Sequence, residues 1–412
     1  FYYNELPKGV IMDYDKAKEN DIELIRKDFP ITKKKIYMNC GSFAPTPLST
    51  IKSITDFLVR CSEEGPDSSS VQEYITSLMK ELRKILCRLI NCEPEEIVFT
   101  QSTTEGLNYV ASGLEWKKSD IIIARGGLHE HYANYFPWLN VSKKYGVKLE
   151  EVKIDKNGFF DLDKIDKIAK NKNSRLITLS HVLYNNGAIM PVEEIGKIAK
   201  KHDLLYSIDA AQSVGTINVN VRKIGCDFLA FPGFKWICGP SGIGIFYCKK
   251  ESAPLLIPKY IGGESAIITE EKNLVYADSP QKFQTGFRNY AGIAGLTSSL
   301  RYIQHMGIDT IRKMNMKVAN EMIEQLRTIP GVSIFVPEDE KLRSSIVSFD
   351  TDSVLSKVVV SKLEENKIIV AERDIVGGGK KKAVRASPHF FNTPDEVFTL
   401  VQNIKNIQNM FG

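Results

Sequence analysis

The sequence lacks the features that mark several common classes of protein. Its 412 residues contain no apolar run long enough to span a membrane, no internal repeat and no low-complexity block. Lysine and arginine are dispersed along the chain and the formal net charge is only +5, which argues against nucleic-acid binding. No signal peptide is recognised. We therefore expect a protein with neither a membrane nor a nucleic acid as its partner.

Cysteine is present, but not in the spacing of a disulfide or metal framework. The chain has seven cysteines and no C-x-x-C pair. An odd number without such spacing predicts reduced thiols and a cytoplasmic location. The cysteines are Cys40, Cys61, Cys87, Cys92, Cys226, Cys238 and Cys248.

The hydrophobic pattern predicts the fold class. Apolar residues recur at helical spacing from about Ser70 to Ile90. Beyond this helix, short apolar runs alternate with amphipathic stretches, one of them from Pro191 to His202. The alternation predicts an α/β fold, in which a mostly parallel sheet carries helices on both faces. The predicted strands are 97–99, 121–124, 149–154, 176–179, 204–208, 228–231 and 243–247.

The pattern changes along the last third of the chain. It fades after about Phe246, and long helical segments with a few short strands follow Ala291. We therefore expect a smaller α+β domain at the C-terminal end. The predicted division is an N-terminal segment of residues 1–36 that packs on the small domain, a large domain of residues 37–290 and the small domain of residues 291–412.

Residues that follow the predicted strands are the first candidates for a site, because ligands bind beyond the carboxyl ends of strands in open α/β sheets. After the first strand, Ser102 and Glu105 have the spacing of a capping box, which predicts a helix N-terminus. Thr103 and Thr104 would add hydroxyl groups to the free N–H groups there and complete an anion site. A plain helix cap explains the same pattern equally well.

Two further strands are followed by polar residues. His129 and His131 flank Glu130 and have the spacing of metal ligands, although His131 could equally stack on a flat ligand. Asp209 follows the strand 204–208, where it is either a buried carboxylate that needs a cationic partner or a helix cap. Gln212 lies one turn further on.

Lys235 stands between Phe234 and Trp236 in the segment "GFKWICGPSGIG". Burial of its ammonium group would lower the pKa and yield an amine nucleophile. The alternative is a surface lysine whose stem covers apolar neighbours.

Together these residues match the needs of one cofactor. Pyridoxal phosphate needs a phosphate site, a group against its ring, a carboxylate at its pyridine nitrogen and a lysine that joins its aldehyde. The order of the candidates along the chain favours this interpretation, without a metal. A metal-dependent hydrolase that uses His129, His131 and Asp209 is the alternative from a different class.

The sequence resembles the fold-type I pyridoxal-phosphate enzymes. More narrowly, it is similar to the class V aminotransferase group, which includes cysteine desulfurases, isopenicillin N epimerase-like proteins and cysteine C–S lyases. The resemblance extends from about Tyr37 to Asn409 and rests on short segments in a shared order. These segments are "YMNCGSFAPTP", "TQSTTEGLN", "EHYANYFPW", "SHVLYNNGAIMPVEEI", "SIDAAQSVG", "GFKWICGPSGIG", "FQTGFRNYAGIAGL" and "VRASPHFFNT".

The resemblance implies a role for each candidate, and it places the cofactor in the large domain. Arg385 would bind the substrate carboxylate, with Arg373 as a second candidate, unless Arg385 pairs structurally with Asp395 or Glu396. A homodimer with sites at its interface is also implied, with His181 near the cofactor. The implied cofactor contacts are Thr103 and Thr104 with the phosphate, His131 with the ring face, Asp209 with the pyridine nitrogen, Gln212 with the phenolic oxygen and Lys235 with the aldehyde as a Schiff base.

The chain also departs from the pattern of the group. No cysteine occurs after Cys248, although desulfurases carry a loop cysteine before the carboxylate-binding arginine, so we do not expect persulfide-forming chemistry. Phe234 replaces a common histidine. Phe287 and Arg288 stand in "GFRN" where relatives often have a threonine that reaches the neighbouring subunit's phosphate, so either Arg288 replaces that contact or the phosphate site differs. The loop 376–382 is not a Walker A motif, and a flap or a solvated loop would both explain it.

These observations predict a pyridoxal-phosphate enzyme that acts on an α-amino acid, with Lys235 moving the Cα proton. An aminotransferase-like reaction is expected first. A cysteine C–S lyase or an amino-acid epimerase on the same scaffold is the alternative.

Overall fold

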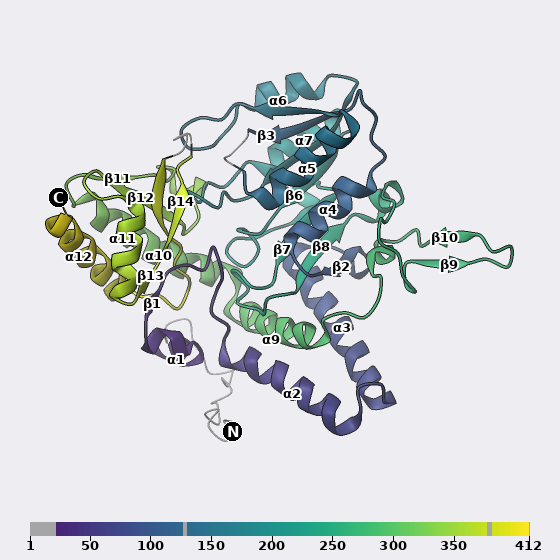
Figure 1. The fold of residues 1–412 in the computed structure, drawn as a ribbon, viewed down its shortest axis with the longest axis horizontal. Helices are drawn as coiled ribbons and strands as arrows, with labels where there is room; N and C mark the ends of the chain where they lie inside the picture. Colours follow the sequence, from purple (N-terminus) through teal and green to yellow (C-terminus); the bar gives the residue numbers. More distant parts are fainter. Residues whose placement is uncertain (1–21, 127–129, 377–380, 412) are drawn as a thin grey trace.

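The computed structural model describes residues 22–126, 130–376 and 381–411. A large sheet with helices on both faces occupies one part of the molecule, and a smaller region built on an antiparallel sheet lies beside it (Figure 1). The predicted fold class is confirmed.

Within the described residues the large sheet has seven strands, and all seven predicted strands belong to it. Among the described strands of this sheet, only β8 runs antiparallel to its neighbours. Across the sheet the order is β2 (Ile97–Thr100), β8 (Gly244–Cys248), β7 (Phe228–Pro232), β6 (Leu205–Asp209), β5 (Ser174–Ser180), β3 (Ile121–Arg125) and β4 (Lys148–Val152).

Side chains alternate between the two faces of each strand, and both faces are buried. In β2, Val98 packs on the face covered by α4 (Thr103–Gly113) and α5 (Tyr132–Tyr145), together with Trp138. Ile97 and Phe99 pack on the opposite face. The helices that contribute to this second cluster include α3 (Ser69–Ile90), α6 (Leu162–Ala169), α7 (Val192–Lys201) and α9 (Tyr290–Met306), and α2 (Leu48–Glu64) and the short α8 (Val221–Ile224) pack beside them.

The helix predicted for residues 70–90 is α3. Its start is fixed by Ser68, whose side chain accepts a hydrogen bond from the N–H of Val71. The residues at helical spacing, among them Ile75 and Leu82, are buried as the periodicity predicts.

The smaller region contains four antiparallel strands, in the order β11 (Val332–Ile334), β12 (Val347–Thr351), β15 (Lys382–Ala386) and β14 (Ala371–Asp374). Its core is closed by α10 (Ile308–Arg327), α11 (Ser356–Glu365) and α12 (Pro394–Phe411). An early strand, β1 (Ile36–Tyr37), pairs in parallel with β13 (Ile368–Ile369) next to this core. The predicted domain boundaries stay a prediction, because packing alone does not show which stretches fold independently.

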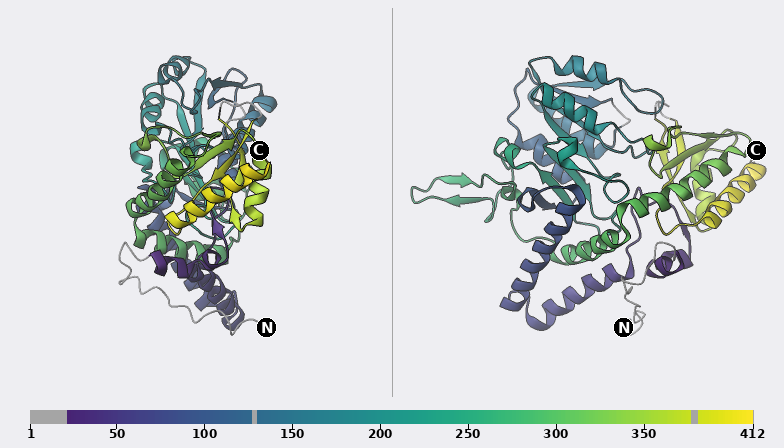
Figure 2. Two further views of the ribbon diagram at one scale, coloured as in Figure 1. Left: turned by 90° about the vertical axis from the view of Figure 1, so that its left-hand side faces the viewer. Right: turned by 180° about the vertical axis from the view of Figure 1, so that it is seen from behind.

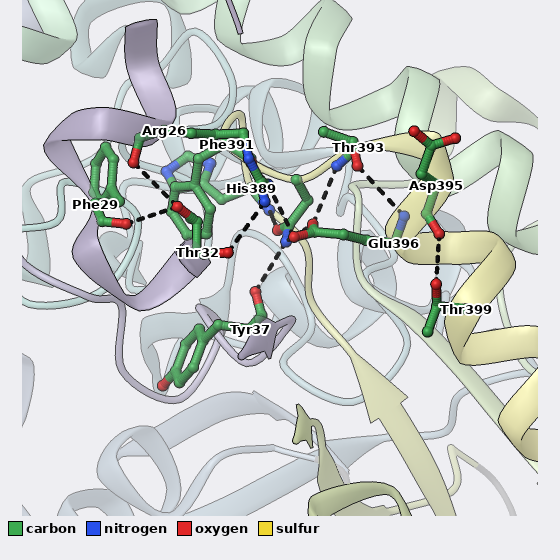
Figure 3. Close-up of polar contacts among 11 residues, drawn as sticks. Arg26, Phe29, Thr32, Tyr37, His389, Phe391, Thr393, Asp395, Glu396 and Thr399 are labelled. Carbon is green, nitrogen blue, oxygen red and sulfur yellow. Dashed lines mark hydrogen bonds and ion pairs between the residues drawn. The ribbon is translucent and has the colours of Figure 1, made fainter. Parts of the chain in front are cut away.

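The first described helix, α1 (Ile22–Asp28), is tied to the start of α12 (Figure 3). Arg26 Nη1 forms an ion pair with Glu396 Oε1 and donates a hydrogen bond to the carbonyl oxygen of Phe391, both at 2.8 Å. Asn392 Nδ2 donates to Glu396 Oε2 at 2.8 Å and to the carbonyl oxygen of Tyr37 at 3.1 Å. These contacts join the start of the described chain to its end; residues 1–21 lie outside the described residues.

A hairpin that was not predicted is formed by β9 (Ala266–Ile268) and β10 (Leu274–Tyr276). It projects from the body of the molecule, on the side opposite the small region (Figures 1 and 2). The described residues also form short 3-10 helices, which are η1 (Pro30–Lys33), η2 (Pro94–Glu96), η4 (Lys250–Leu255), η5 (Pro280–Phe283) and η6 (Glu340–Leu342). Within the described ranges no helix is both long and apolar enough to cross a membrane.

Candidate active site

A cavity of about 240 Å³ lies where the parallel strands of the large sheet end, and residues of β14 and β15 line it as well. Of the nine residues predicted to bind the cofactor or the substrate, all but one line it. Those brought together are Thr103, Thr104, His131, Asp209, Gln212, Lys235, Arg373 and Arg385. The structure thus collects residues from six separate segments of the chain at one place, while their individual roles stay a prediction.

Lys235 follows β7, and its side chain is partly accessible from the cavity but otherwise enclosed by protein. Burial lowers the pKa of its amine to about 8, although Asp209 opposes this shift. The surface-lysine interpretation is therefore wrong. An amine with this pKa is partly neutral near neutral pH, as a nucleophile or a base requires.

Asp209 is the last residue of β6 and is only 3% exposed. Its Oδ1 accepts a hydrogen bond of 2.8 Å from the N–H of Ala211. Burial raises the pKa of this carboxyl to about 6, and Lys235 offsets part of the rise. A cation placed against Asp209 would lower the pKa again, which is the contribution that a protonated ring nitrogen makes.

The predicted helix N-terminus is that of α4. The Ser102 side chain accepts a hydrogen bond of 3.2 Å from the N–H of Glu105, and Glu105 Oε2 accepts one of 2.5 Å from the N–H of Gln101. Thr103 and Thr104, the first two residues of α4, line the cavity. Free backbone N–H groups and threonine hydroxyls at this end are suited to a phosphate.

His131 caps α5, and its Nδ1 accepts a hydrogen bond of 3.2 Å from the N–H of Ala133. An accepting Nδ1 leaves the proton of the neutral ring on Nε2. Burial lowers the pKa of His131 to about 4, and the positive charge of Lys235 adds to the effect. The ring of Tyr184 packs edge-on at 5.1 Å between centroids. Glu130 accepts a hydrogen bond of 3.1 Å from the His131 N–H and so fixes this turn.

The metal-hydrolase alternative finds no support. His129 lies outside the described residues. In the part of the chain that the structure describes, no group of three or more histidine, cysteine, aspartate or glutamate side chains is placed to hold a metal ion.

Arg385 comes from β15, and its side chain is among the largest that are fully buried. Its Nη1 donates to the carbonyl oxygen of Tyr184 at 2.8 Å, and its Nη2 donates to Asn39 Oδ1 at 3.1 Å. The alternative prediction was that Arg385 pairs with Asp395 or Glu396. Glu396 instead forms an ion pair with Arg26, so a pair between Arg385 and Glu396 is wrong. Within the described ranges, no carboxylate lies in ion-pair distance of Arg385.

A second guanidinium group faces the same cavity. The hydroxyl oxygen of Ser42 accepts hydrogen bonds from Arg385 Nη2 at 2.6 Å and from Arg373 Nη2 at 2.7 Å. Burial lowers the pKa of Arg385 to about 9, and the charge of Arg373 contributes to the shift. Among the described residues no carboxylate lies in ion-pair distance of either guanidinium group, although Asp374 and Glu372 act on Arg373 at longer range. Two such cations form a strong site for a carboxylate ligand.

Gln212 is held by a chain of hydrogen bonds behind the cavity. Its Oε1 accepts from Trp236 Nε1 at 2.7 Å, and its Nε2 donates to the carbonyl oxygen of Gly41 at 2.8 Å. No acceptor in the described part of the chain takes the second N–H of this amide. A Cβ atom at Gly41 would lie 3.2 Å from Ser387 Oγ and 3.3 Å from both Gln212 Oε1 and Arg385 Cζ, so a larger residue here would press on all three groups. His389 Nε2 donates to the Trp236 carbonyl oxygen at 2.9 Å.

Arg288 is the exception among the residues predicted to bind the cofactor or the substrate. It lines a second cavity of about 420 Å³, together with Thr285 and Phe287. Its Nε donates to Gln284 Oε1 at 2.7 Å, and its Nη1 donates to Glu264 Oε1 at 3.0 Å. The structure therefore does not bring Arg288 to the cavity that contains Lys235 in the same chain.

His181, which was expected near the cofactor, is hydrogen-bonded to Asp209 but does not line the cavity. Its backbone N–H donates to the Asp209 carbonyl oxygen at 2.9 Å, and burial lowers the pKa of its ring to about 4. Sequence reasoning gave no role to Ser42 and Tyr184, which do line the cavity. Both belong to segments that carried the family resemblance, and nothing in those segments signalled their contacts with Arg385.

The cavity therefore offers an anion site, a neutral imidazole, a buried carboxylate and an amine of lowered pKa. This donor set fits the phosphate, the ring, the ring nitrogen and the aldehyde of pyridoxal phosphate. The fold and the cavity thus define a class, the fold-type I pyridoxal-phosphate enzymes.

Comparison with known proteins narrows the class. The family model for aminotransferase class-V matches residues 36–400, so the chain belongs to that family and is a pyridoxal-phosphate-dependent enzyme that acts on an amino acid. A probable cysteine desulfurase of Methanothermobacter thermautotrophicus is 33% identical over 94% of this chain and 98% of its own length.

Comparison with solved structures supports the same family. The cysteine desulfurase of Thermococcus onnurineus NA1 is 31% identical, covers 94% of this chain and 98% of its own, and superposes with a TM-score of 0.88. The cystine C–S lyase C-DES, solved with its product cysteine persulfide, is 25% identical over 92% of this chain and 99% of its own, with a TM-score of 0.83.

Proposed function

We propose that the protein is a C–S lyase that cleaves cysteine or cystine by β-elimination, without passing sulfur to a thiol of its own. One observation carries the proposal: the amine of Lys235 and the unneutralised guanidinium group of Arg385 face one cavity whose described lining contains no cysteine. Relatives named for cysteine C–S chemistry support this choice of bond. The absence of any cysteine after Cys248 supports elimination rather than persulfide transfer.

The proposed cofactor contacts follow from the donor set of the cavity. Thr103, Thr104 and the N-terminus of α4 hold the phosphate, and His131 lies against the ring. Asp209 keeps the ring nitrogen protonated, and the available N–H of Gln212 donates to the phenolic oxygen. When bound, pyridoxal phosphate supplies the aldehyde that takes the substrate amine and the ring that withdraws electrons from Cα.

Arg385 binds the α-carboxylate with its planar fork, and Ser42 keeps the guanidinium group at a fixed angle. Arg373, joined to the same hydroxyl group, adds positive charge on that side of the cavity. These contacts orient the substrate so that its Cα–H bond points to Lys235.

Lys235 moves the proton. Its Nζ takes the Cα proton, the Cβ–S bond breaks, and the electron pair leaves with the sulfur atom. The proton held on Lys235, or the Nε2 proton of His131, then neutralises the departing sulfur. Hydrolysis of the remaining three-carbon fragment gives pyruvate and ammonia. The sulfur product is sulfide from cysteine, or cysteine persulfide from cystine.

We also propose a homodimer with active sites at its interface. Phe287 is 93% exposed, and Ile267 and Ile268 of the hairpin are 68% and 73% exposed, which supports burial against a second copy. In this dimer Arg288 contacts the phosphate site of the partner subunit, in place of the threonine that relatives often have in this segment. We further propose a cytoplasmic location, which seven free cysteines support.

An amino-acid panel tests the reaction. Purified holoenzyme is incubated with L-cysteine, L-cystine, L-alanine and L-aspartate, with and without a keto-acid acceptor, and sulfide, persulfide, pyruvate, new amino acids and racemised product are measured. We expect pyruvate together with sulfur product from the sulfur substrates alone. Acceptor-dependent transamination without sulfur release would instead make the enzyme an aminotransferase, and racemisation would make it an epimerase.

A further inference from the structure

The C-terminal end of α3 places two cysteines in contact. Asn91 directly follows the helix in a left-handed conformation, with φ of 59°, and the N–H of Cys92 donates to the Cys87 carbonyl oxygen at 3.1 Å. This is the hydrogen-bond pattern of a Schellman motif, in which the side chains at these two positions pack together. Two apolar side chains usually fill that contact. Here two thiols fill it.

The sulfur atoms of Cys87 and Cys92 lie 3.7 Å apart. A disulfide bond is about 2 Å long, so the two sulfurs must approach further and adopt the required torsion. The turn already holds their backbones together through the hydrogen bond of Cys92. The pair is therefore close to bonding geometry without any rearrangement of distant segments.

The two thiols differ in accessibility and in acidity. Cys87 is half-buried, whereas Cys92 is buried. The Cys92 thiol donates to the Cys87 sulfur, and this contact lowers the pKa of Cys87, against the opposing effects of burial and of Glu93, Glu95 and Glu96. The same contact, together with burial, raises the pKa of Cys92. Cys87 is therefore the better nucleophile of the two.

We propose that Cys87 and Cys92 are a reversible modification site, which an external low-molecular-weight disulfide oxidises to an intramolecular disulfide. The Cys87 thiolate attacks one sulfur of the external disulfide, forms a mixed disulfide and releases one thiolate. Cys92 then loses its proton and attacks the Cys87 sulfur, which releases the second thiolate. Two protein thiols are oxidised, and one external disulfide is reduced to two thiols.

This inference is independent of the proposed reaction. Neither cysteine lines the cavity that contains Lys235. Oxidation of the pair should therefore leave the cofactor spectrum and turnover of the holoenzyme unchanged.

Oxidised glutathione is the probe. Native holoenzyme is treated with it, free thiols are alkylated, and the protein is digested without reduction and mapped by mass spectrometry. We expect the number of free thiols to fall from seven to five. A cross-linked peptide that joins Cys87 to Cys92 should appear, with a mass two hydrogen atoms below the summed mass of the two thiol peptides. Dithiothreitol should restore all the thiols. Seven free thiols after prolonged oxidation would overturn the proposal.

Three variants separate the roles. Cys92→Ser should stop at a glutathione adduct on Cys87, because no second thiol resolves it. Cys87→Ser should show neither disulfide nor adduct at Cys92. Cys61→Ser is the matched control, since Cys61 is also half-buried but lies against no cysteine sulfur in the described structure, and it should still form the cross-link. An adduct on Cys92 rather than Cys87, or a disulfide that requires Cys61, would contradict the assignment.

Discussion

Arg373 and Arg385 share one hydrogen-bond acceptor, the hydroxyl oxygen of Ser42, at 2.7 and 2.6 Å. The two guanidinium groups repel each other, and the hydroxyl group of Ser42 carries no charge that could neutralise them. Its hydrogen bonds only fix the direction in which the two groups point. In the proposed enzyme, the carboxylate of the substrate would supply the missing negative charge. This relationship makes the arginine pair the structural basis of amino-acid recognition in the proposed enzyme.

Arg385→Lys should weaken substrate recognition while sparing the cofactor. Lysine keeps the charge but loses the planar fork. We expect kcat/KM for the amino-acid substrate to fall by roughly tenfold or more, with the absorbance of bound cofactor unchanged. Steady-state kinetics and a visible spectrum measure both.

The matched control for this variant is Arg343→Lys. Arg343 is also largely buried and donates to main-chain oxygens, but it does not line the cavity. Its kinetic constants should stay close to those of the parent. If Arg385→Lys performs like the parent enzyme, Arg385 does not bind the carboxylate and Arg373 becomes the residue to test.

Lys235→Ala should abolish covalent attachment of the cofactor. Borohydride reduction of the wild-type holoenzyme, followed by peptide mapping, should place the pyridoxyl label on Lys235. Lys282 is an internal control, because it is also buried with a lowered pKa but lies outside the cavity. A label on Lys282 or any other lysine would refute the assignment.

The lowered pKa of Lys235 predicts how cofactor loading depends on pH. Only the neutral amine attacks an aldehyde, and burial lowers the pKa of Lys235 to about 8. The rate of loading of cofactor-free enzyme should therefore rise with pH up to about 8 and then level off. An unperturbed lysine would give a rate that still climbs above pH 9. Stopped-flow absorbance across this range distinguishes the two profiles.

Asp209→Asn should retain the cofactor but lose most of the turnover. The amide cannot hold a proton on the ring nitrogen by its charge, so the ring withdraws electrons less well. We expect kcat to fall by at least roughly tenfold, with cofactor content unchanged. Near-parental kcat in a fully loaded Asn variant would show that Asp209 does not act on the ring nitrogen.

Much of the site was predictable because parallel strands end at one edge of a sheet. Asp209 ends β6 and Lys235 follows β7, so their proximity followed from the pattern of apolar runs. Ser42 was missed because it meets Arg385 across 343 residues of sequence, and no local pattern reports such a contact.

The two strands of the hairpin were missed since each has only three residues. An apolar run also carries no strand direction, so the antiparallel course of β8 could not be predicted.

Arg26→Ala should destabilise the folded protein. Its partner Glu396 is buried, and removal of the guanidinium group leaves that carboxylate with fewer donors. We expect a loss of about 1–3 kcal/mol in the free energy of unfolding, measured by urea denaturation. Arg301→Ala is the control: its pair with Glu81 is exposed, and its removal should cost less than about 1 kcal/mol. Equal losses in the two variants would show that the Arg26 pair has no special structural role.

The contact between α1 and α12 also bears on how the chain folds during synthesis. Arg26 leaves the ribosome long before Glu396, from which it is separated by 370 residues. Until the segment before α12 emerges, the ring of Phe29 lacks its contacts with Phe390 and Phe391. Closure of such a long loop carries a large entropy cost and comes late. The nascent chain therefore has to carry α1 without aggregation or misfolding until α12 is complete.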